Sequence, residues 1–359
     1  MAEREREPTA RRVVVVQTAY LGDLVLTTPL VREIARACEG SSITVVTTAL
    51  GPDVFAGLPG VDDVIAFDKR AAGARGLVRM ARRLRAGRFE VALVAHRSHR
   101  SAALVALAGI GRRIGFAQAP GAWAYTETVA RDLGRHAVHR YLALAGPLGG
   151  SPESADPRPV VAGAARSRGA ARRLLEDVGI GESQPFVALA PGSVWPTKRW
   201  TPDGFAGVAR GTRALGIESV LVGSSADVEP CLAVEASVRG GVRSLVGRTT
   251  VGEFAAVLER AVAVVGNDSG ATHVAAAVGT PAIAVFGPTV PAQGLGPVGD
   301  AHRVVEHPGL ACRPCGPHGG RRCPLGHFRC MREIGADRVL DVLVPIVERA
   351  LPRYAPPFG

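Results

Sequence analysis

Short, uninterrupted apolar segments alternate with helical stretches along the chain. A strand buried on both faces of a parallel sheet is apolar throughout, whereas a half-exposed strand alternates apolar with polar residues. Repeated strand–helix–strand units of this kind predict an α/β fold with parallel sheets and right-handed crossovers. In the first half the expected strands are residues 13–18, 43–47, 64–67 and 91–95, and the expected helices are 23–38, 75–85 and 101–108.

The alternation pauses at residues 151–159, which are rich in proline, serine and acidic groups. It restarts after an expected helix at 164–178, with strands at 186–190, 219–222, 262–266 and 282–286 and helices at 202–215, 270–278 and 337–351. A length of 359 residues exceeds what one hydrophobic core usually fills. We therefore predict two Rossmann-like parallel-sheet domains facing a cleft, with ligands at the carboxyl ends of the strands. The expected bounds are 1–160 for the first domain, 161–182 for a linker helix, 183–335 for the second domain and 336–359 for a C-terminal helix and tail.

The formal net charge of +11 is concentrated in one part of the chain. Residues 70–113 contain eleven arginines and a single acidic residue, Glu90. A nucleic-acid binder more often interleaves such basic stretches with aromatic residues, and Phe89 is the only aromatic residue in this window. The window therefore predicts a localised acidic partner, such as a phosphorylated lipid or sugar. The alternative is a solvated, arginine-rich helix face.

Lysine and asparagine are almost absent from the sequence. Lys69 and Lys198 are the only lysines among 43 basic residues, and Asn267 is the only asparagine. Arginine and lysine differ in shape and hydration, so a lysine that persists in such a composition points to a position where arginine fails.

Targeting and membrane-spanning signals are missing. The first residues mix charges and lack the apolar core of a signal peptide, and no run reaches the ~18 apolar residues of a spanning helix. The protein is therefore expected to be cytoplasmic and at most peripheral to a membrane.

The first strand-to-helix turn, residues 18–24, contains Asp23 where a dinucleotide-binding fold would show G-x-G-x-x-G. The missing glycines argue against an NAD enzyme. Asp23 has two interpretations: an N-cap carboxylate that binds free backbone N–H groups, or a general base at the cleft.

The loop at residues 191–202 opens the second half and predicts an anion site. Gly192 permits a close backbone approach, Ser193 and Thr197 offer hydroxyls, and Lys198 supplies a compact positive charge. The alternative is a surface loop whose lysine extends into solvent.

The segment 265–273 runs from a strand into a helix and forms a third element at the same edge. Backbone amides at the N-terminus of this helix would face a phosphate, aided by the helix dipole. Asp268 would repel phosphate, so it suits sugar hydroxyls or caps the helix. His273 lies one turn further on the same helix face as Ser269, where it either supports a ligand or is structural.

Together these three elements resemble the lipopolysaccharide heptosyltransferases of glycosyltransferase family 9. Residues 266–289 are similar to that family's signature, and the turn at 21–23 and the loop at 191–200 match its other two landmarks. The resemblance runs from about residue 13 to 351. It implies a GT-B architecture, with an acceptor-binding first domain and a nucleotide-sugar-binding second domain. The late cysteine cluster favours the heptosyltransferase II branch.

The resemblance also implies a reaction. The donor would be ADP-heptose, and the acceptor would be a heptose on the anionic Kdo–lipid A inner core at the inner leaflet of the membrane. Asp23 would be the base of an inverting displacement, and Lys198 would stabilise the departing ADP. Positive groups and helix dipoles would replace a metal, so Mg²⁺ is not required. Hydrogen bonds to the diphosphate and sugar would come from Ser193, Thr197, Asp268, Ser269, Gly270 and His273.

Two further assignments follow position in the chain rather than motif. The loop that follows the expected strand at 219–222 carries Asp227 and Glu229, and an acidic residue there, taken here as Asp227, would bind the donor's ribose. His96, Arg97 and Arg100 follow the strand at 91–95 and would face the acceptor. No nucleic-acid partner is expected.

Four cysteines cluster late, at Cys312, Cys315, Cys323 and Cys330. Their spacing resembles a zinc knuckle, and a cytoplasmic location disfavours disulfides. The cluster is therefore either a structural zinc site or a group of reduced or redox-labile thiols.

Three rival functions stand beside this interpretation. The same fold can host a glycosyltransferase with another sugar nucleotide or acceptor. A zinc- and arginine-dependent nucleic-acid-binding protein would leave Asp23 and Lys198 without a role. A serine hydrolase is disfavoured because the G-x-S-x-G motif is missing.

Overall fold

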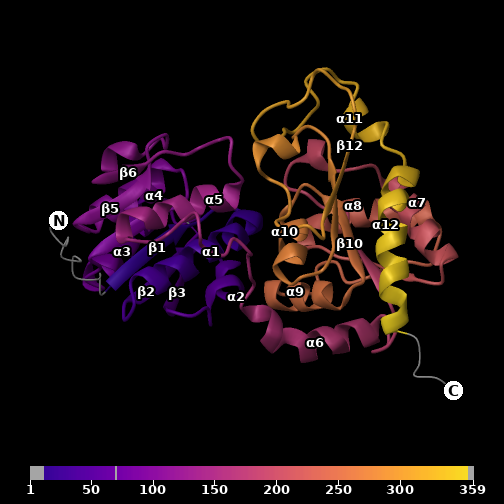
Figure 1. Ribbon diagram of the computed structural model, residues 1–359, viewed down its shortest axis with the longest axis horizontal. Helices are drawn as coiled ribbons and strands as arrows, with labels where there is room; N and C mark the ends of the chain where they lie inside the picture. The colour runs from indigo at the N-terminus through magenta and orange to yellow at the C-terminus, as the bar shows by residue number, and fades with distance from the viewer. Residues whose placement is uncertain (1–11, 69–70, 355–359) are drawn as a thin grey trace. The chain divides into compact units, whose positions relative to one another are not determined.

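The computed structural model describes residues 12–68 and 71–354 (Figure 1). The chain divides into two compact units, of which the first ends at Gly163 and the second begins at Ala164, close to the boundary predicted at residue 160. The predicted linker helix corresponds to α6 (Gly163–Asp177), which belongs almost entirely to the second unit. Lys69 lies outside the described residues.

The first unit is built on a six-stranded sheet in which every neighbouring pair is parallel, in the order β3-β2-β1-β4-β5-β6. Continuous apolar segments form its buried centre: all four residues of β4 and five of the six in β1 are buried. The chain order reverses between β1 and β4, and in open parallel sheets such a reversal leaves a crevice at the strands' carboxyl ends. The strands are β1 (Arg12–Gln17), β2 (Ser42–Thr47), β3 (Val61–Ala66), β4 (Val91–Val94), β5 (Arg112–Phe116) and β6 (Glu127–Val129).

Within the described part of the first unit, four α-helices lie between these strands and a fifth, α5, follows β6. They are α1 (Leu21–Ala37), α2 (Gly51–Phe55), α3 (Gly73–Ala86), α4 (His99–Leu107) and α5 (Ala137–Leu142). Helix α1 follows β1 and packs against α5, which lies more than a hundred residues later in the chain. Helices α3 and α4 also pack against each other.

The second unit repeats this plan with another parallel six-stranded sheet, in the order β12-β11-β10-β7-β8-β9. Here the order reverses between β7 and β10. The loops that follow these two strands therefore meet at one edge of the sheet. The strands are β7 (Phe186–Ala190), β8 (Glu218–Leu221), β9 (Arg243–Ser244), β10 (Ala263–Asn267), β11 (Ala282–Phe286) and β12 (Arg303–Glu306).

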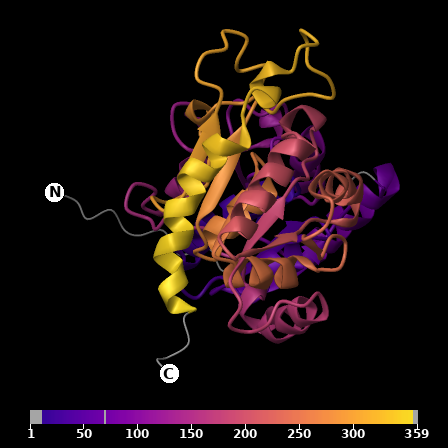
Figure 2. The same cartoon turned by 90° about the vertical axis from the view of Figure 1, so that its right-hand side faces the viewer.

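Helices cover both faces of the second sheet. Figure 1 shows α9 and α10 on one side and α7 and α12 on the other, and Figure 2 shows α12 running beside α7. These helices and the remaining ones are α7 (Pro202–Ala214), α8 (Val228–Val238), α9 (Val251–Arg260), α10 (Gly270–Ala277), α11 (Arg329–Arg332) and α12 (Ala336–Ala350).

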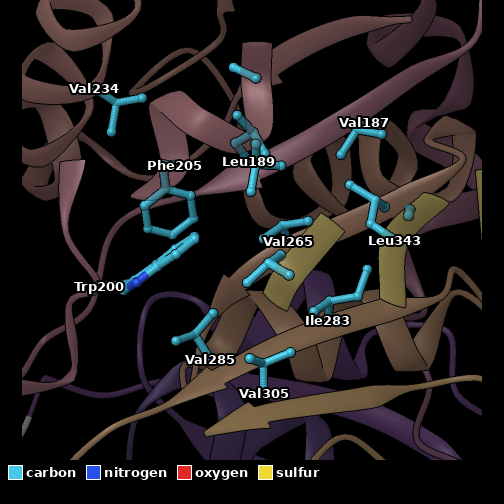
Figure 3. Close-up of a cluster of buried hydrophobic side chains, with 14 of the residues drawn as sticks. Val187, Leu189, Trp200, Phe205, Val234, Val265, Ile283, Val285, Val305 and Leu343 are labelled. Atoms are coloured by element: carbon cyan, nitrogen blue, oxygen red, sulfur yellow. The ribbon is translucent and has the colours of Figure 1, made fainter. Parts of the chain in front are cut away.

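A hydrophobic core lies between the second sheet and the helices on one of its faces (Figure 3). Side chains of the central strands, such as Val265 and Ile283, are fully buried there. Trp200 packs edge-on against Phe205 of α7, with ring centroids 5.1 Å apart. The Trp200 indole donates to the carbonyl of Ile334 at 3.0 Å. This core anchors the end of the loop that carries Lys198.

The predicted α/β fold is confirmed, and every strand and helix expected from the sequence is present within a few residues. The strands that sequence patterns do not reveal are β5, β6, β9 and β12. They begin with charged residues or span only two to five positions, so they lack a continuous apolar run. In residues 12–68 and 71–354, no helix combines the length and low polarity needed to cross a bilayer.

Candidate functional site

The carboxyl ends of β1 and β4 carry a group of hydrogen-bonded polar side chains. Thr18 follows β1 and His96 follows β4, and the Thr18 hydroxyl lies 3.1 Å from Nδ1 of His96. Ser101, from the first turn of α4, places its hydroxyl 3.2 Å from the same nitrogen. The predicted site residue His96 is therefore held at the reversal point of the first sheet by two hydroxyl groups.

Asp23 lies in the first turn of α1, near the same edge. The helix begins at Leu21 and Tyr20 occupies its N-cap position, so the N-cap interpretation of Asp23 is wrong. The Tyr141 hydroxyl donates to Oδ1 of Asp23 at 2.7 Å. Asp23 is partly exposed and its carboxylate is oriented by a fixed donor. These properties suit the predicted general base.

Tyr141 is a site residue that the sequence analysis misses. It lies on α5, 118 positions from Asp23, and belongs to no recognisable motif. Burial, and after it the charge and hydrogen bond of Asp23, raises the pKa of Tyr141 well above its ordinary value. The phenol therefore stays protonated and continues to donate. Tyr141 is one of only four tyrosines, and this rarity is the only feature of the sequence that could have drawn attention to it.

Arg131 adds positive charge close to Asp23 and is also missed by the sequence analysis. Burial lowers the pKa of Arg131, and the charges of Arg140 and Arg97 lower it further, while Asp23 acts in the opposite direction. Arg131 therefore lies within electrostatic range of two other arginines and of Asp23.

The predicted acceptor residues Arg97 and Arg100 are both exposed, next to His96. Arg97 donates from Nη2 to the carbonyl of Gln118 at 2.8 Å, which fixes the direction of its side chain. The structure thus places the three predicted acceptor residues together at the end of β4. Their contact with an acceptor stays a prediction.

The arginine-rich window does not form one continuous face. Arg113 donates to the carbonyls of Ala124 and Ile110, and Arg112 pairs with Glu127 at 2.6 Å. These arginines bind other parts of the first unit and so stabilise its fold. By contrast, the exposed residues Arg75, Arg79 and Arg82 on α3 have no ion pair or hydrogen bond within the described chain. Because they recur at helical spacing, they form one row on the helix, here called the α3 stripe.

In the second unit, Asn267 holds the loop that follows β7. Its side-chain nitrogen donates to the carbonyls of Pro191 at 2.8 Å and Gly192 at 3.3 Å. Its side-chain oxygen accepts from the backbone nitrogen of Trp200 at 2.8 Å. Only an amide can donate and accept in this way, and the side chain is fully buried. This arrangement explains why the single asparagine of the chain stands here.

Lys198 and Asp268 form a buried ion pair at the edge where β7 and β10 end. Nζ of Lys198 donates to Oδ2 of Asp268 at 2.5 Å, and the side chains are 9% and 4% exposed. Thr289, which follows β11, donates its hydroxyl to the same oxygen at 2.6 Å. The alternative of a surface loop with a lysine in solvent is therefore wrong. A buried charge pair requires close partners of this kind.

The other predicted donor residues lie around this pair. Ser269 is the N-cap residue of α10 and Gly270 its first residue, directly after Asp268. Ser193 and His273 are buried, and the Thr197 hydroxyl donates to the carbonyl of Gly320 at 2.8 Å. The structure brings these residues to one edge of the second sheet, while their contacts with a donor stay predictions.

Asp227 lies against the same loop. Its Oδ2 accepts from the backbone nitrogen and the hydroxyl of Ser224, at 2.9 and 2.7 Å. A Cβ at Gly192 would lie 2.1 Å from Oδ1 of Asp227. The group that lies close to Gly192 in the structure is the side chain of Asp227, and a side chain at position 192 would displace it. A close approach by a bound anion stays a prediction.

The four late cysteines are free thiols that lie near one another. Cys315, Cys323 and Cys330 line a small cavity of about 60 Å³. Burial and the neighbouring thiols raise the pKa of Cys330 to about 11. In the part of the chain that the structure describes, no three histidine, cysteine or acidic side chains converge in an arrangement that would hold a metal ion.

Comparisons with known proteins agree with this geometry. A family model described as glycosyltransferase family 9 (heptosyltransferase) matches residues 77–325, which include the Lys198–Asp268 pair and begin after Asp23. Lipopolysaccharide heptosyltransferase 2 of Salmonella typhimurium is 27% identical, over 78% of this chain and 84% of the relative.

Two solved structures share the fold. The glycosyl transferase family 9 protein from Veillonella parvula has a TM-score of 0.83 at 24% identity, covering 94% of this chain and 98% of that one. The E. coli ADP-heptose lps heptosyltransferase II has a TM-score of 0.76 at 23% identity, covering 95% and 99%. These likenesses confirm the predicted GT-B architecture of two Rossmann-like domains.

Proposed function

The chain belongs to glycosyltransferase family 9, and we propose that it transfers L-glycero-D-manno-heptose from ADP-heptose to the heptosyl-Kdo-lipid A inner core of lipopolysaccharide, with inversion. The observation that carries this proposal is the buried Lys198–Asp268 pair beside the first turn of α10, within the matched family region. The relatives named as heptosyltransferases support the choice of sugar, and the E. coli structure's name supports the adenine nucleotide.

On the donor side, Lys198 faces the departing diphosphate. An ammonium group has three N–H donors, and the bond to Asp268 uses one of them. The other two bind phosphate oxygens, assisted by the backbone amides at Ser269 and Gly270 and the dipole of α10. Asp268 also binds the heptose hydroxyls and fixes the lysine. These charges stabilise the leaving group without a requirement for a metal ion.

On the acceptor side, Asp23 accepts the proton of the attacking hydroxyl. One glycosidic C–O bond forms while the C–O bond to the diphosphate breaks, and a single displacement inverts the anomeric carbon. Tyr141 keeps the Asp23 carboxylate in one orientation. The base is therefore pre-organised, and no conformational entropy is lost in orienting it during the reaction. His96, Arg97 and Arg100 bind the anionic inner core.

Turnover of ADP-heptose with a Kdo–lipid A acceptor ending in one heptose tests this function. We expect product with inverted configuration from this donor, and none from UDP-sugars. Asp23→Ala should abolish turnover while ADP binding stays at the wild-type level. Efficient turnover of another sugar nucleotide would favour the rival glycosyltransferase, and retained activity in the variant would remove Asp23 from the role of base.

We further propose that the α3 stripe holds the enzyme at the anionic inner face of the cytoplasmic membrane, where a glycolipid acceptor would lie. Helix α3 contains no acidic residue, and Val78, between the arginines, is 42% exposed. Each arginine near such a surface contributes about 1 kcal/mol of binding. Nucleic acid is not proposed as a partner.

Vesicle co-sedimentation tests the membrane proposal. Replacing all three stripe arginines by glutamine should weaken binding to vesicles with anionic lipid by about a hundredfold, following the per-residue value. Binding to neutral vesicles should be negligible throughout. The matched control carries the same charge change at exposed arginines of the second unit, Arg173, Arg213 and Arg239. Equal losses in both triple variants would show that only total charge matters.

A structural zinc ion at Cys312, Cys315, Cys323 and Cys330 also stays a proposal, beside the alternative of reduced thiols. Elemental analysis of freshly reduced protein decides between them. One zinc per chain would assign the thiols as ligands, whereas the lack of stoichiometric zinc would leave four reduced thiols.

A further inference from the structure

The segment that carries the four cysteines, residues 312–330, packs directly onto the loop that contains Lys198. We call it the cysteine segment; it ends in the first turn of α11 and extends beyond the sheet at the top of Figure 2. Thr197 and Gly320 are joined by reciprocal hydrogen bonds: the Thr197 hydroxyl donates to the Gly320 carbonyl and accepts from the Gly320 amide, both at 2.8 Å. The rings of Trp195 and His318 stack, with centroids 4.4 Å apart and 10° between their planes.

The same segment holds the chain that follows β11. The Arg313 side chain is 5% exposed, and its guanidinium donates to the carbonyls of Gly287 and, at 2.8 Å, of Thr289. It also binds Glu306 at the end of β12, at 2.7 Å. The Cys315 amide donates to the Pro288 carbonyl at 2.8 Å. These bonds fix the backbone of Thr289, whose hydroxyl binds Asp268.

Gly319 lies against the stem of Lys198 and the two neighbouring loops. It has a φ of +76°, and a Cβ added there would lie 3.0 Å from Oγ1 of Thr197 and 3.1 Å from Cγ of Pro288. It would also lie 3.3 Å from Cγ of Lys198. The backbone of the cysteine segment therefore rests on the aliphatic stem of the lysine and on both loops that flank it.

We propose that the cysteine segment is a positioning element, which sets the place of the Lys198 ammonium and the Asp268–Thr289 bond for the donor's diphosphate. This inference rests on the proposed function, in that it takes the ligand of Lys198 to be a nucleoside diphosphate. It acts through residues that touch the ligand and supplies no reacting group. Within the described residues, Gly319 and Gly320 of the segment contact Thr197, Lys198 and Pro288 in the donor loops. Arg313 of the segment binds the carbonyl of Thr289.

Two glycines of the segment provide a matched pair of variants. Gly319 and Gly326 have nearly the same left-handed φ, +76° and +72°, so alanine strains the backbone about equally at both positions. Nothing lies within 4 Å of a Cβ at Gly326, whereas the Cβ at Gly319 meets the donor loops. A difference between Gly319→Ala and Gly326→Ala therefore reports contact with the donor site and not backbone strain.

The readouts are ADP affinity by calorimetry, steady-state kinetics, and amide hydrogen exchange in the peptide spanning residues 193–199. For Gly319→Ala we expect about tenfold weaker ADP binding, a matching rise in KM for ADP-heptose with an unchanged KM for the acceptor, and faster exchange at Thr197. We expect Gly326→Ala to match the wild type in all three, with equal unfolding midpoints for the two variants. Arg313→Lys, which keeps the charge but loses the branched set of donors, should behave like Gly319→Ala.

Equal ADP affinities and equal exchange in the two glycine variants would overturn the positioning role. If the wild type binds no ADP, the proposed function fails. The exchange comparison then still decides whether the segment orders the loop of Lys198.

Discussion

Single residues with both donor and acceptor capacity hold the candidate site together. Asn267 binds the loop of Lys198 at Pro191, Gly192 and Trp200, and an aspartate there could not donate to the two carbonyls. Tyr141 performs the corresponding task for Asp23, because burial keeps its phenol protonated. In each case one buried polar side chain fixes a residue that the proposed reaction uses.

The hydrogen bond from Tyr141 to Asp23 leads to a prediction at this scale. Hydrogen bonds to charged groups are worth about 1.5–3 kcal/mol. We therefore expect Tyr141→Phe to lower kcat by roughly tenfold to a hundredfold, since 1.4 kcal/mol corresponds to a factor of ten. ADP affinity, measured by calorimetry, should not change.

Tyr125→Phe is the matched control for that variant. The Tyr125 hydroxyl is buried and has no hydrogen-bond partner among the described residues. Its removal should leave kcat within twofold of the wild type. A wild-type kcat in Tyr141→Phe would show that Asp23 needs no orienting donor.

At the scale of elements, the two sheet reversals place the chemistry. Loops after β1 and β4 gather Thr18, His96 and the first turn of α1, while loops after β7 and β10 gather Lys198 and Asp268. Helix termini contribute as well, because α1 carries Asp23 in its first turn and α10 begins directly after Ser269.

Helix α7 begins immediately after the loop of Lys198, and its N-cap is testable. The Thr201 hydroxyl accepts from the backbone nitrogen of Gly204 at 3.1 Å. Loss of such a cap costs about 1 kcal/mol. We expect Thr201→Ala to lower the free energy of unfolding in urea by that amount, and Thr201→Ser to restore it. Equal stabilities of the alanine and serine variants would mean that the cap contributes nothing.

At the scale of the whole molecule, both units bury groups that resist losing a proton. Burial raises the pKa of Tyr125 to about 12 and that of Cys231 to about 12, and the pKa of Cys330 rises to about 11. In the unfolded chain these groups titrate near their ordinary values of 9 to 10. Above those values the unfolded state therefore holds fewer protons than the folded state.

The sign of the resulting pH dependence follows from this difference. The stabilisation is fully present below about pH 9, and it is lost as the pH rises from there towards the folded-state pKa values. We expect the unfolding free energy, measured by urea titration, to fall steadily between about pH 9 and 11. A value that stays constant over this range would contradict the raised pKa values.

Local patterns in the sequence were sufficient to predict the alternation of strands and helices, the two-domain plan and the positions of Asp23, Lys198 and Asp268 at strand ends. These features depend on the periodicity of neighbouring residues, which the sequence displays directly. The same patterns did not reveal the short strands with charged starts, because such strands have no continuous apolar run.

Only the tertiary structure decided which of these residues meet. Lys198 pairs with Asp268 across 70 positions and Tyr141 binds Asp23 across 118, and both contacts depend on how helices and loops pack on the sheets. In the sequence, the arginine-rich window at residues 70–113 forms one continuous basic stretch. Packing divides it into arginines that bind carbonyls and carboxylates of the fold and the unpaired α3 stripe. Sequence spacing determines the face of a helix, but the partners on that face are set by elements far away in the chain.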